Sequence, residues 1–566
     1  MTERLNIRSL RFRSGSTEGA EALDVTTPSV TLLVGPNNSG KSSALKELES
    51  WAHGAEGPFS VIDHITLDLP DTVADVRSMM RVFESEPPSG HTREPNHTWY
   101  ARPVIRSGES EYRTQVADQS WEQWFENRTD VGNFRALRSS FVRPFVLRLD
   151  GRTRFELMDD KPTGPLEAPP ANHLWALFID DAQREKVREF TEAAFGKHFV
   201  IDPTGMNSYR VRLSNRRPAD QQEEQALDQR ARSFHQAAPL VSSLGDGVKA
   251  ATGLVSAVMS SSHRILLIDE PEAFLHPTLA RRMGRTLSEA AQQRGASLVI
   301  ATHSADVLMG CIQSTPQLRL VRLTYDGDSG TARSIDTAAV SALMNDPLLR
   351  STSALRALFH RSVVVSEADS DRAFYEEINA RMLQEGRGVE DSLFLNAQNW
   401  QTIVRIVSPL RQLGIPAAAV FDFDVLMSDE FATVWGLVNS PPAELARLQQ
   451  ERAQVKAYMD AVGKELCKRN GVAAFGGAEA HAINGFIANM EAFGVFFVPV
   501  GELEGWLQNL SVSRARKNRW ITEMFEALGA DPDDDSYVRP GADDVWDFVA
   551  RIERWSGDPS RLGIPS

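Results

Sequence analysis

The segment Gly35-Pro-Asn-Asn-Ser-Gly40-Lys41-Ser42 constrains the fold of this chain more than any other part of its sequence. It fits the phosphate-loop pattern at every fixed position, between an apolar run over 30–34 and a helical pattern that begins near Ala44. Glycines let backbone N–H groups turn toward phosphates, Lys41 reaches the β and γ oxygens, and the Ser42 hydroxyl can ligate Mg²⁺. The loop residues expected at the nucleotide are Gly35, Asn38, Gly40, Lys41, Ser42 and Ser43. We therefore expect an α/β unit that binds ATP and Mg²⁺.

A second strand is expected to complete this nucleotide site. The apolar run Ile265-Leu-Leu-Ile268 ends in Asp269 and Glu270, which would serve the metal and, as general base, the attacking water. A run that ends in Asp-Glu is common and usually structural, but it gains meaning when paired with a phosphate loop. The next apolar run, over 297–300, is followed by His303, which we expect to contact the γ-phosphate.

Composition limits the class of protein. The 566 residues are 42% hydrophobic and 24% charged, an ordinary globular composition that at about 150 residues per domain predicts three to four domains, or two large ones. No apolar run approaches the ~18 residues of a membrane span and no signal-peptide pattern is present, so we expect a cytoplasmic protein with no membrane partner. Two cysteines exclude a disulfide framework and a cysteine zinc site. A net charge of −15 predicts weak nonspecific binding to nucleic acid.

Three pairs of carboxylates follow three apolar runs in the last third of the chain. The pairs are Glu367 with Asp371, Asp422 with Asp424, and Glu502 with Glu504. Because parallel strands end at one edge of a sheet, these carboxylates are expected to collect there, although each pair alone could equally be a cap or a solvated turn. Their charges would repel one another unless divalent cations neutralise them, and an all-oxygen ligand set favours Mg²⁺ or Mn²⁺. Two such ions can activate water against a phosphodiester.

The nucleotide motifs resemble the ABC-type ATPase head shared by structural-maintenance and recombination ATPases. This resemblance implies a signature loop that closes the nucleotide site of a partner subunit, and therefore a homodimer or higher homo-oligomer through the heads. Ser243-Leu-Gly-Asp-Gly247 is the best match, so Ser243, Gly245 and Gly247 are carried over as nucleotide-binding residues. The long separation of Lys41 from Asp269 predicts an insertion over 76–235, used for dimerisation or for binding a partner.

The carboxylate pairs resemble those of a TOPRIM domain, the metal-dependent fold of topoisomerases, primases and some nucleases. With the ATPase motifs, the order is most similar to OLD-family (overcoming lysogenisation defect) endonucleases, including the Gabija nuclease subunit and retron-associated relatives. The resemblance makes all six carboxylates metal ligands or their supports, with Glu367, Asp422 and Asp424 catalytic. It also implies a late lysine, for which Lys517 is the candidate, although the segment around it could instead be the solvated face of a helix.

The expected architecture is α/β: an ABC-type P-loop ATPase head over 1–75 and 236–350, an inserted mainly helical region over 76–235, and a TOPRIM α/β domain over 351–566. The expected function is an ATP-regulated, Mg²⁺-dependent endonuclease that cleaves DNA in defence against phage, with a defence-system protein or retron DNA as further partner. Two alternatives stay open: an ATPase scaffold whose inactive TOPRIM domain only binds nucleic acid or a partner, and a ribonuclease acting on tRNA. Ala368, where the family usually has glycine, favours the scaffold. The basic cluster Lys464, Lys468 and Arg469 is expected at the surface.

Overall fold

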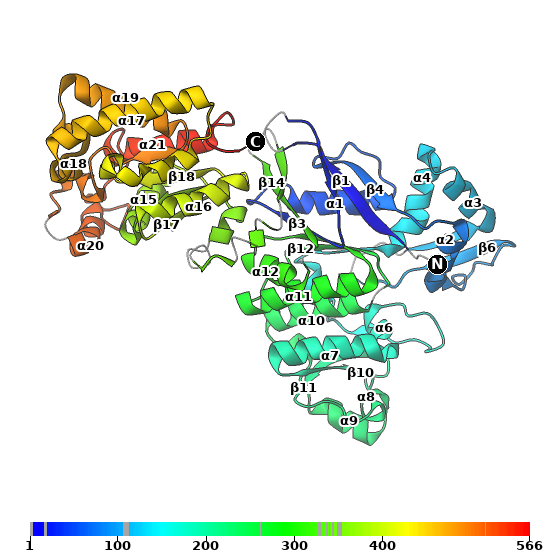
Figure 1. Cartoon of the computed structure of the whole chain (residues 1–566). Helices are drawn as coiled ribbons and strands as arrows, with labels where there is room; N and C mark the ends of the chain where they lie inside the picture. Colours follow the sequence, from blue (N-terminus) through cyan, green and yellow to red (C-terminus); the bar gives the residue numbers. More distant parts are fainter. Residues whose placement is uncertain are drawn as a thin grey trace. The chain divides into compact units, whose positions relative to one another are not determined.

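The computed structural model folds as two compact units, one holding Asn38–Thr337 with the strands that precede it and the other Ala338–Ser566 (Figure 1). The residues that the structure describes are 4–15, 20–105, 112–260, 262–315, 317–325, 330–335, 338, 340–341, 345–347, 354–514 and 517–565. Within these ranges, no helix is both long and apolar enough to cross a membrane. Each unit is built around its own sheet, as the α/β prediction requires.

A six-stranded sheet forms the centre of the first unit. In spatial order its strands are β15 (Gly330–Ile335), β14 (Leu318–Tyr325), β3 (Val30–Val34), β13 (Ser297–Ala301), β12 (Ile265–Asp269) and β8 (Val146–Leu149). All neighbouring pairs are parallel except β14 with β15. The strands β3, β12 and β13 are buried at every residue, which is the pattern of parallel strands covered on both faces. Their apolar runs are the ones that the sequence singled out.

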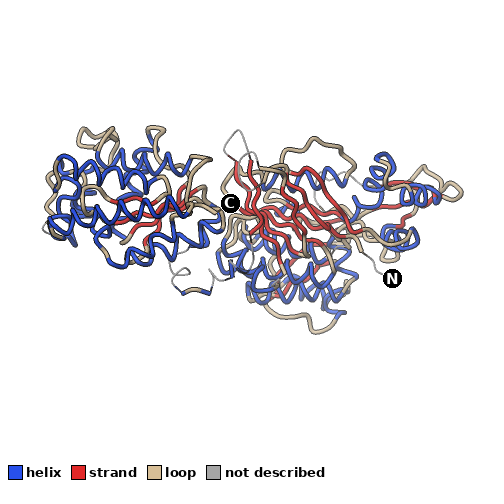
Figure 2. The backbone as a smooth tube through the Cα atoms, turned by 45° about the horizontal axis from the view of Figure 1, so that its top comes forward, coloured by secondary structure: helices blue, strands red, loops and turns tan. Residues whose placement is uncertain are grey.

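Helices enclose this sheet, as the tube view shows (Figure 2). The helices α1 (Lys41–Ala52), α10 (Asp246–Met259), α11 (Pro277–Arg294) and α12 (Ala305–Ser314) carry most of the packing. The closest approach is between α11 and α12, where a Cβ built on Gly310 would lie 2.0 Å from the Arg281 carbonyl oxygen. A second sheet, of β1 (Asn6–Phe12), β2 (Leu23–Thr26) and β4 (Ile62–Asp68), packs into the same hydrophobic core as α1.

The segment 76–235 contains more helix than strand, as the sequence predicts, but it is not wholly an insertion into the ATPase head. Its strand β8 pairs with β12 and completes the nucleotide-binding sheet, while two further three-stranded sheets lie on either side of it in sequence. Those strands are β5 (Glu84–Ser85), β6 (His97–Ala101), β7 (Arg113–Ala117), β9 (Lys161–Pro162), β10 (His198–Asp202) and β11 (Ser208–Ser214). The helices of this part of the chain are α2 (Val73–Met80), α3 (Asp118–Glu126), α4 (Val131–Leu137), α5 (Thr153–Glu156), α6 (His173–Ile179), α7 (Asp181–Phe195), α8 (Gln221–Gln225) and α9 (Gln229–Gln236).

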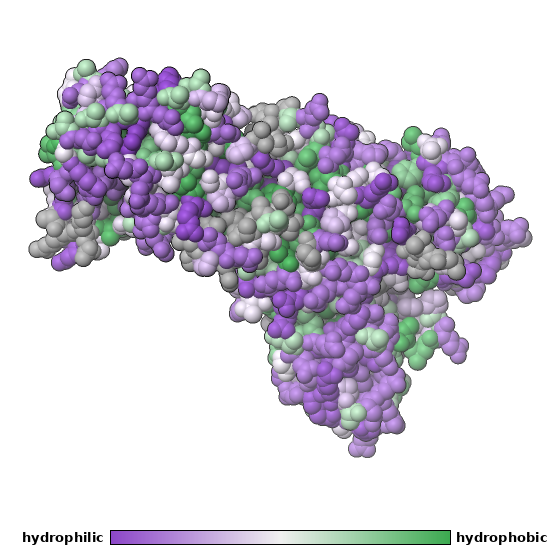
Figure 3. Space-filling view, viewed as in Figure 1, coloured by the Kyte–Doolittle hydropathy of each residue, from purple (hydrophilic) through white to green (hydrophobic). Residues whose placement is uncertain are grey.

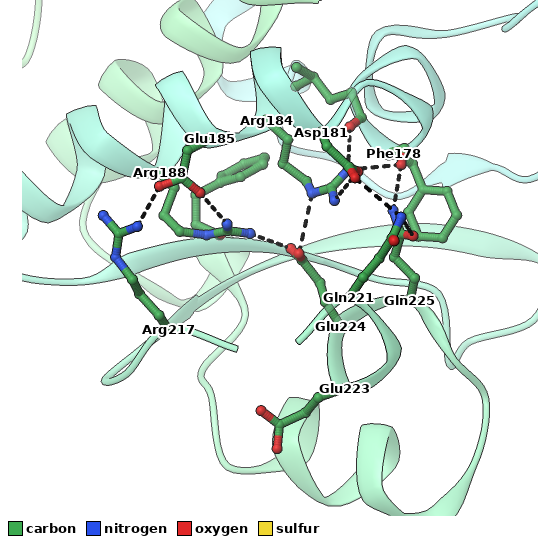
Figure 4. Close-up of polar contacts among 12 residues, drawn as sticks. Phe178, Asp181, Arg184, Glu185, Arg188, Arg217, Gln221, Glu223, Glu224 and Gln225 are labelled. Carbon is green, nitrogen blue, oxygen red and sulfur yellow. Dashed lines mark hydrogen bonds and ion pairs between the residues drawn. The ribbon is translucent and has the colours of Figure 1, made fainter. Parts of the chain in front are cut away.

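The lobe around α7, α8 and α9 has a mostly hydrophilic surface in the view of Figure 3 but contains a buried charge network (Figure 4). The polar stretch from Gln221 to Arg232 forms two helices, and Glu224 in the first of them is buried, with its side chain 3% exposed. Its carboxylate accepts hydrogen bonds from Arg184 at 3.3 Å and Arg188 at 2.7 Å, both on α7. A buried carboxylate needs such partners, and these lie too far away in sequence to be foreseen.

The second unit is built on a four-stranded parallel sheet that helices surround (Figure 2). In spatial order its strands are β17 (Ser392–Asn396), β16 (Ser362–Ser366), β18 (Ala417–Phe421) and β19 (Val495–Phe497). The helices are α15 (Asp369–Gln384), α16 (Trp400–Gln412), α17 (Pro442–Val462), α18 (Lys464–Asn470), α19 (Gly477–Glu491), α20 (Lys517–Leu528) and α21 (Asp544–Gly557). Parallel pairing brings the carboxyl ends of β16, β18 and β19 to one edge, which positions the residues that follow them.

Candidate functional site

The phosphate loop joins β3 to α1 through backbone conformations that favour glycine. Gly35 and Gly40 have φ of 138° and 89°, and Asn38 has φ of 60°. Gly40 is the N-cap of α1, so the N–H groups of the helix's first turn face the loop. Lys41 is only 6% exposed, and its Nζ donates a hydrogen bond to Ser39 Oγ at 3.2 Å. The loop therefore has the geometry of an anion site at a helix N-terminus.

The two predicted metal ligands of the nucleotide site lie together. Leu33 of β3 and Asp269 of β12 both pair with Ala301 of the intervening strand β13, so loop and carboxylate leave the sheet at one edge. The Ser42 hydroxyl donates to Asp269 Oδ1 at 3.0 Å. Burial, together with the Glu270 charge, raises the pKa of Asp269, although the Ser42 hydrogen bond opposes this. A hydroxyl beside a buried carboxylate next to a phosphate loop fits Mg²⁺ bound to a triphosphate.

Glu270 and His303 also come together, as their order in the sequence suggests. His303 Nε2 lies 2.7 Å from Glu270 Oε1, and the backbone N–H of His303 donates to Glu272 Oε1 at 2.9 Å. Burial raises the pKa of Glu272. Glu270 has φ of 49°, the left-handed region that a non-glycine residue rarely adopts. The carboxylate is thus held beside the loop by a strained backbone and a histidine.

A cavity of about 530 Å³ opens beside the phosphate loop. Loop residues from Asn38 to Ser43 form one wall, and Arg13 and Tyr325 contribute from β1 and β14 and the turns beyond them. Its mixture of apolar and polar groups next to the phosphate-binding N–H groups suits the base and ribose of a nucleotide.

The predicted signature residues lie at the start of α10. Ser243 ends a 3-10 turn, is exposed, and donates from its hydroxyl to the Leu240 carbonyl oxygen at 2.7 Å. Gly245 is the N-cap of α10. At Gly247 a Cβ would stand 2.7 Å from the Phe274 carbonyl oxygen, so glycine is required for the chain that follows β12 to pass. Their role at a partner's nucleotide stays a prediction.

The carboxylates of the second unit gather at the edge that the sequence predicts. Glu367 directly follows β16 and Asp422 directly follows β18, while Glu502 lies in the turn after β19. Asp371 belongs to the first turn of α15 and accepts the Ala368 N–H at 2.9 Å. Glu504 lies nearby in sequence on a short 3-10 turn, Leu503–Gly505.

Burial and mutual repulsion shift the pKa values of these groups. Burial raises the pKa of Asp422 well above its ordinary value, and the charges of Asp371 and Glu367 add to this rise. Burial likewise raises the pKa of Asp371 to about 6. The pKa of Glu367 is raised by burial, then by Asp371 and Asp424. Each group disfavours ionisation of the others, which is the electrostatic situation that a cation relieves.

Lys464 and Arg469 of α18 are exposed, as the expected surface cluster requires, but Lys464 and the half-buried Lys468 also reach this carboxylate edge. Lys468 Nζ lies 3.3 Å from Glu502 Oε1 and 3.6 Å from Asp424 Oδ2, and Lys464 Nζ lies 3.2 Å from Asp424 Oδ2. No local pattern predicts this contact, because α18 begins 40 residues beyond Asp424, after the helix α17. The side chain of the candidate Lys517 is outside the described residues, although Lys517 begins α20.

The donor set fits Mg²⁺ or Mn²⁺ in chemistry, since every candidate ligand is a carboxylate oxygen. Among the residues that the structure describes, however, no three His, Cys, Asp or Glu side chains converge closely enough to hold an ion. The ammonium groups of Lys464 and Lys468 stand against Asp424 instead. Ala368 has φ of −118° and ψ of 169°, extended backbone that any residue adopts, so glycine is not required there.

Comparison with known proteins agrees with the nucleotide site. The family model described as "AAA domain, putative AbiEii toxin, Type IV TA system" matches residues 30–310. The phosphonates import ATP-binding protein PhnC 2 of Synechococcus sp. (strain JA-2-3B'a(2-13)) is 32% identical over 84 residues, and its namesake in Albidiferax ferrireducens (strain ATCC BAA-621 / DSM 15236 / T118) is 33% identical over 86. Each alignment covers 15% of this chain and 31% of the relative. The chain thus spans about a third of the length of the curated relatives it matches.

Solved structures similar to the chain include SMC heads. One described as the SmcHead bound to the C-winged helix domain of ScpA is 12% identical with a TM-score of 0.34, over 60% of this chain and 99% of that one. The SMC head domain from Thermotoga maritima is 13% identical with a TM-score of 0.30, over 58% and 99%. The loop geometry, the family match and the ATP-binding relatives together support an ABC-type P-loop ATPase in the first unit.

Proposed function

We propose that this chain is an ATP-regulated, divalent-metal-dependent endonuclease that cleaves nucleic acid, chiefly DNA. The observation that carries the nuclease part is a group of four carboxylates at one sheet edge. The pKa values of Glu367, Asp371 and Asp422 are raised there, and Glu502 forms an ion pair with Lys468. Such an edge serves phosphodiester chemistry better than it serves stability. A role in defence against phage rests on the similarity to OLD-family nucleases, and the toxin in the matched family's description is compatible with it.

In the ATPase unit, the loop N–H groups and Lys41 would bind the β and γ phosphates, and Ser42 with Asp269 would hold Mg²⁺. Bound Mg²⁺ would neutralise phosphate charge. Glu270 would take the proton of the attacking water, with His303 orienting its carboxylate. Ser243, Gly245 and Gly247 of a second copy would close the site, so the active form would be a homodimer through the ATPase heads.

In the second unit, Glu367, Asp422 and Asp424 would hold the cations, with Asp371, Glu502 and Glu504 as supports. Those cations would supply an activated water and charge neutralisation at the phosphodiester. Lys468 is held by Asp424 and Glu502 and can donate to a phosphate oxygen that gains charge during cleavage. Lys517 stays a candidate for the same task.

Nicking of supercoiled plasmid with Mg²⁺ or Mn²⁺ tests the nuclease. Wild type should nick only with the cation, and Asp422→Asn should lower the rate at least about 100-fold, since a ligand is lost. The matched control is Asp429→Asn, a carboxylate 95% exposed near the same strand. Equal nicking by wild type and Asp422→Asn would refute the nuclease. Nucleotide control would be supported if ATP changes the nicking rate of wild type but not that of Lys41→Met.

One observation favours a second candidate, an ATPase scaffold with an inactive second unit. The ammonium groups of Lys464 and Lys468 already neutralise Asp424 and Glu502, and the described carboxylates do not converge on one point. A scaffold would bind nucleic acid without cutting it. A mobility shift that is identical for wild type and Asp422→Asn, with no cleavage under any cation, would establish this alternative.

A further inference from the structure

The turn that follows β12 carries the proposed general base in a strained conformation. Two of its non-glycine residues adopt the left-handed region: Glu270 with φ of 49° and Phe274 with φ of 67°. Such conformations persist only where the surroundings determine them, and they gather at functional sites. What fixes this turn therefore decides where the Glu270 carboxylate points.

The short helix α5 contacts both ends of the turn. Arg154 Nη2 donates hydrogen bonds to the carbonyl oxygens of Asp269 and Glu270. The next residue, Phe155, packs its ring edge-to-face on Phe274 with centroids 4.9 Å apart. Two consecutive side chains thus hold the two strained residues, from a helix that lies more than 100 positions earlier in sequence.

Burying the charged side chain of Arg154 at this position carries a cost in desolvation free energy. This residue is 1% exposed, and its Nε and Nη1 have no hydrogen-bond partner among the residues that the structure describes. Burial lowers its pKa, although the charges of Glu272 and Glu270 oppose this. A buried guanidinium that is only partly hydrogen-bonded is a poor device for stability alone. Its Nη2 contacts the backbone of Asp269, the proposed Mg²⁺ ligand, and of Glu270, the proposed general base.

The helix α5 is itself confined. A Cβ on Gly253 of α10 would stand 2.7 Å from the Arg154 carbonyl oxygen, so the backbones of α10 and α5 pack directly against each other. On the other side, Gly247 of α10 touches the Phe274 carbonyl oxygen in the same way. The backbones of α5 and of the turn, which carry Arg154 and Phe274, therefore cannot shift toward α10 unless α10 moves as well.

We propose that Arg154 is a positioning residue for ATP hydrolysis: by holding the carbonyl oxygens of Asp269 and Glu270, it fixes the Glu270 backbone so that its carboxylate faces His303 and the attacking water. This rests on the proposed role of Glu270. In that step the water oxygen bonds to the γ-phosphorus, the bond to the bridging oxygen breaks toward ADP, and Glu270 takes the proton. Both hydrogen bonds come from the two N–H groups of Nη2, and the shorter lysine side chain would not place its ammonium at the same point.

Steady-state ATPase kinetics and ATP affinity test this. Arg154→Met should lower kcat about 10- to 100-fold, the loss that follows a misplaced catalytic group, with the Kd for ATP within about threefold of wild type. The kcat of Arg154→Lys should lie between those of Arg154→Met and wild type. Arg152→Met, an exposed arginine on the same segment, is the matched control and should behave as wild type. In the Glu270→Gln background, Arg154→Met should cause no further loss, because it acts through Glu270.

The outcomes separate the two proposals. If Glu270→Gln hydrolyses ATP as wild type does, the role of Glu270 fails and the inference fails with it. If Glu270→Gln is inactive, two results would overturn the role of Arg154 alone. One is a folded Arg154→Met variant with kcat within twofold of wild type. The other is an Arg154→Met substitution that lowers the residual hydrolysis of Glu270→Gln further. Should Arg154→Met not fold, Arg154→Lys decides by the same measurements, with an unchanged kcat counting against the proposal.

Discussion

Lys468 changes how the carboxylate edge of the second unit works. Burial lowers its pKa, but the charges of Asp424 and Glu502 outweigh this, so the pKa is raised overall and the ammonium stays charged at neutral pH. It lies against two of the carboxylates that the proposed nuclease would use. In that proposal the same side chain would compete with metal for these carboxylates and would donate to the phosphate during cleavage.

Replacing this lysine separates its two effects. Lys468→Met should lower the nicking rate at saturating Mg²⁺ about 10- to 100-fold, since one donor to the phosphate is lost. It should also reduce the Mg²⁺ concentration for half-maximal rate, because a competing cation is gone. Lys456→Met on α17, which removes an ion pair with Asp460, is the control. A wild-type rate and wild-type Mg²⁺ dependence would count against a role for Lys468.

Residues inside fixed motifs could be placed from the sequence, and residues outside them could not. Ser42 and Asp269 come from two patterns whose geometry is constant, and they meet at 3.0 Å. Arg154 and Lys468 have no local pattern, because each acts through a contact between elements far apart in the chain. Tertiary packing alone brings them to their sites.

At the scale of elements, α8 is attached to α7 through one buried carboxylate. Glu224 lies between Arg184 and Arg188, and Arg184 also pairs with Asp181 (Figure 4). Neither arginine can reach water easily from this position, so the network is stable only as a set.

Removing the charge of Glu224 should destabilise this lobe. Glu224→Gln leaves two buried guanidinium groups short of a counter-charge, and breaking such a pair costs about 3–5 kcal/mol of unfolding free energy. Thermal unfolding followed by calorimetry should show the first unit melting earlier. Glu192→Gln, which removes an exposed partner of Arg217, is the matched control and should leave the unfolding free energy close to that of wild type. Equal effects of both substitutions would contradict the network's role.

Elements with long apolar runs were predictable, and short ones were not. The strands β3, β12, β13, β16 and β18 are buried at every position and read as strands in the sequence. The strand β8 has four residues and includes Arg148, whose guanidinium pairs with Glu49 and Asp150. Four residues are too few to show a period, so its pairing with β12 emerged only from the fold.

For the whole molecule, different buried ionisable groups prevail in the two units. The first unit buries His173, His235 and His263, and burial lowers the pKa of each, that of His173 to about 3. Burial also raises the pKa of two carboxyl groups of this unit, Asp269 and Glu272, which opposes the effect of the three histidines. The second unit buries a cluster of carboxyl groups with raised pKa values, among them Asp371 with a pKa of about 6. With the histidines prevailing in the first unit, the two units should respond to acid in opposite directions.

The sign follows from which state takes up protons first. An unfolded histidine protonates near pH 6.5 while the buried one does not, so acidification favours unfolding of the first unit, approaching about 1.4 kcal/mol per pH unit for each histidine. A buried carboxyl with a raised pKa protonates in the folded state first. Lowering the pH from 7.5 to about 5 therefore stabilises the second unit, since its like charges are removed.

Calorimetry between pH 7.5 and 5.5, without divalent cations, should show the transition of the first unit falling and that of the second rising. Asp371→Asn should raise the second transition at pH 7.5 and flatten its pH dependence, because the group that titrates at about pH 6 is gone. Asp369→Asn, an exposed neighbour whose pKa is lowered by Arg372, serves as control and should leave the rise intact. If acid lowers both transition temperatures in parallel, repulsion among these carboxylates does not destabilise the second unit at neutral pH.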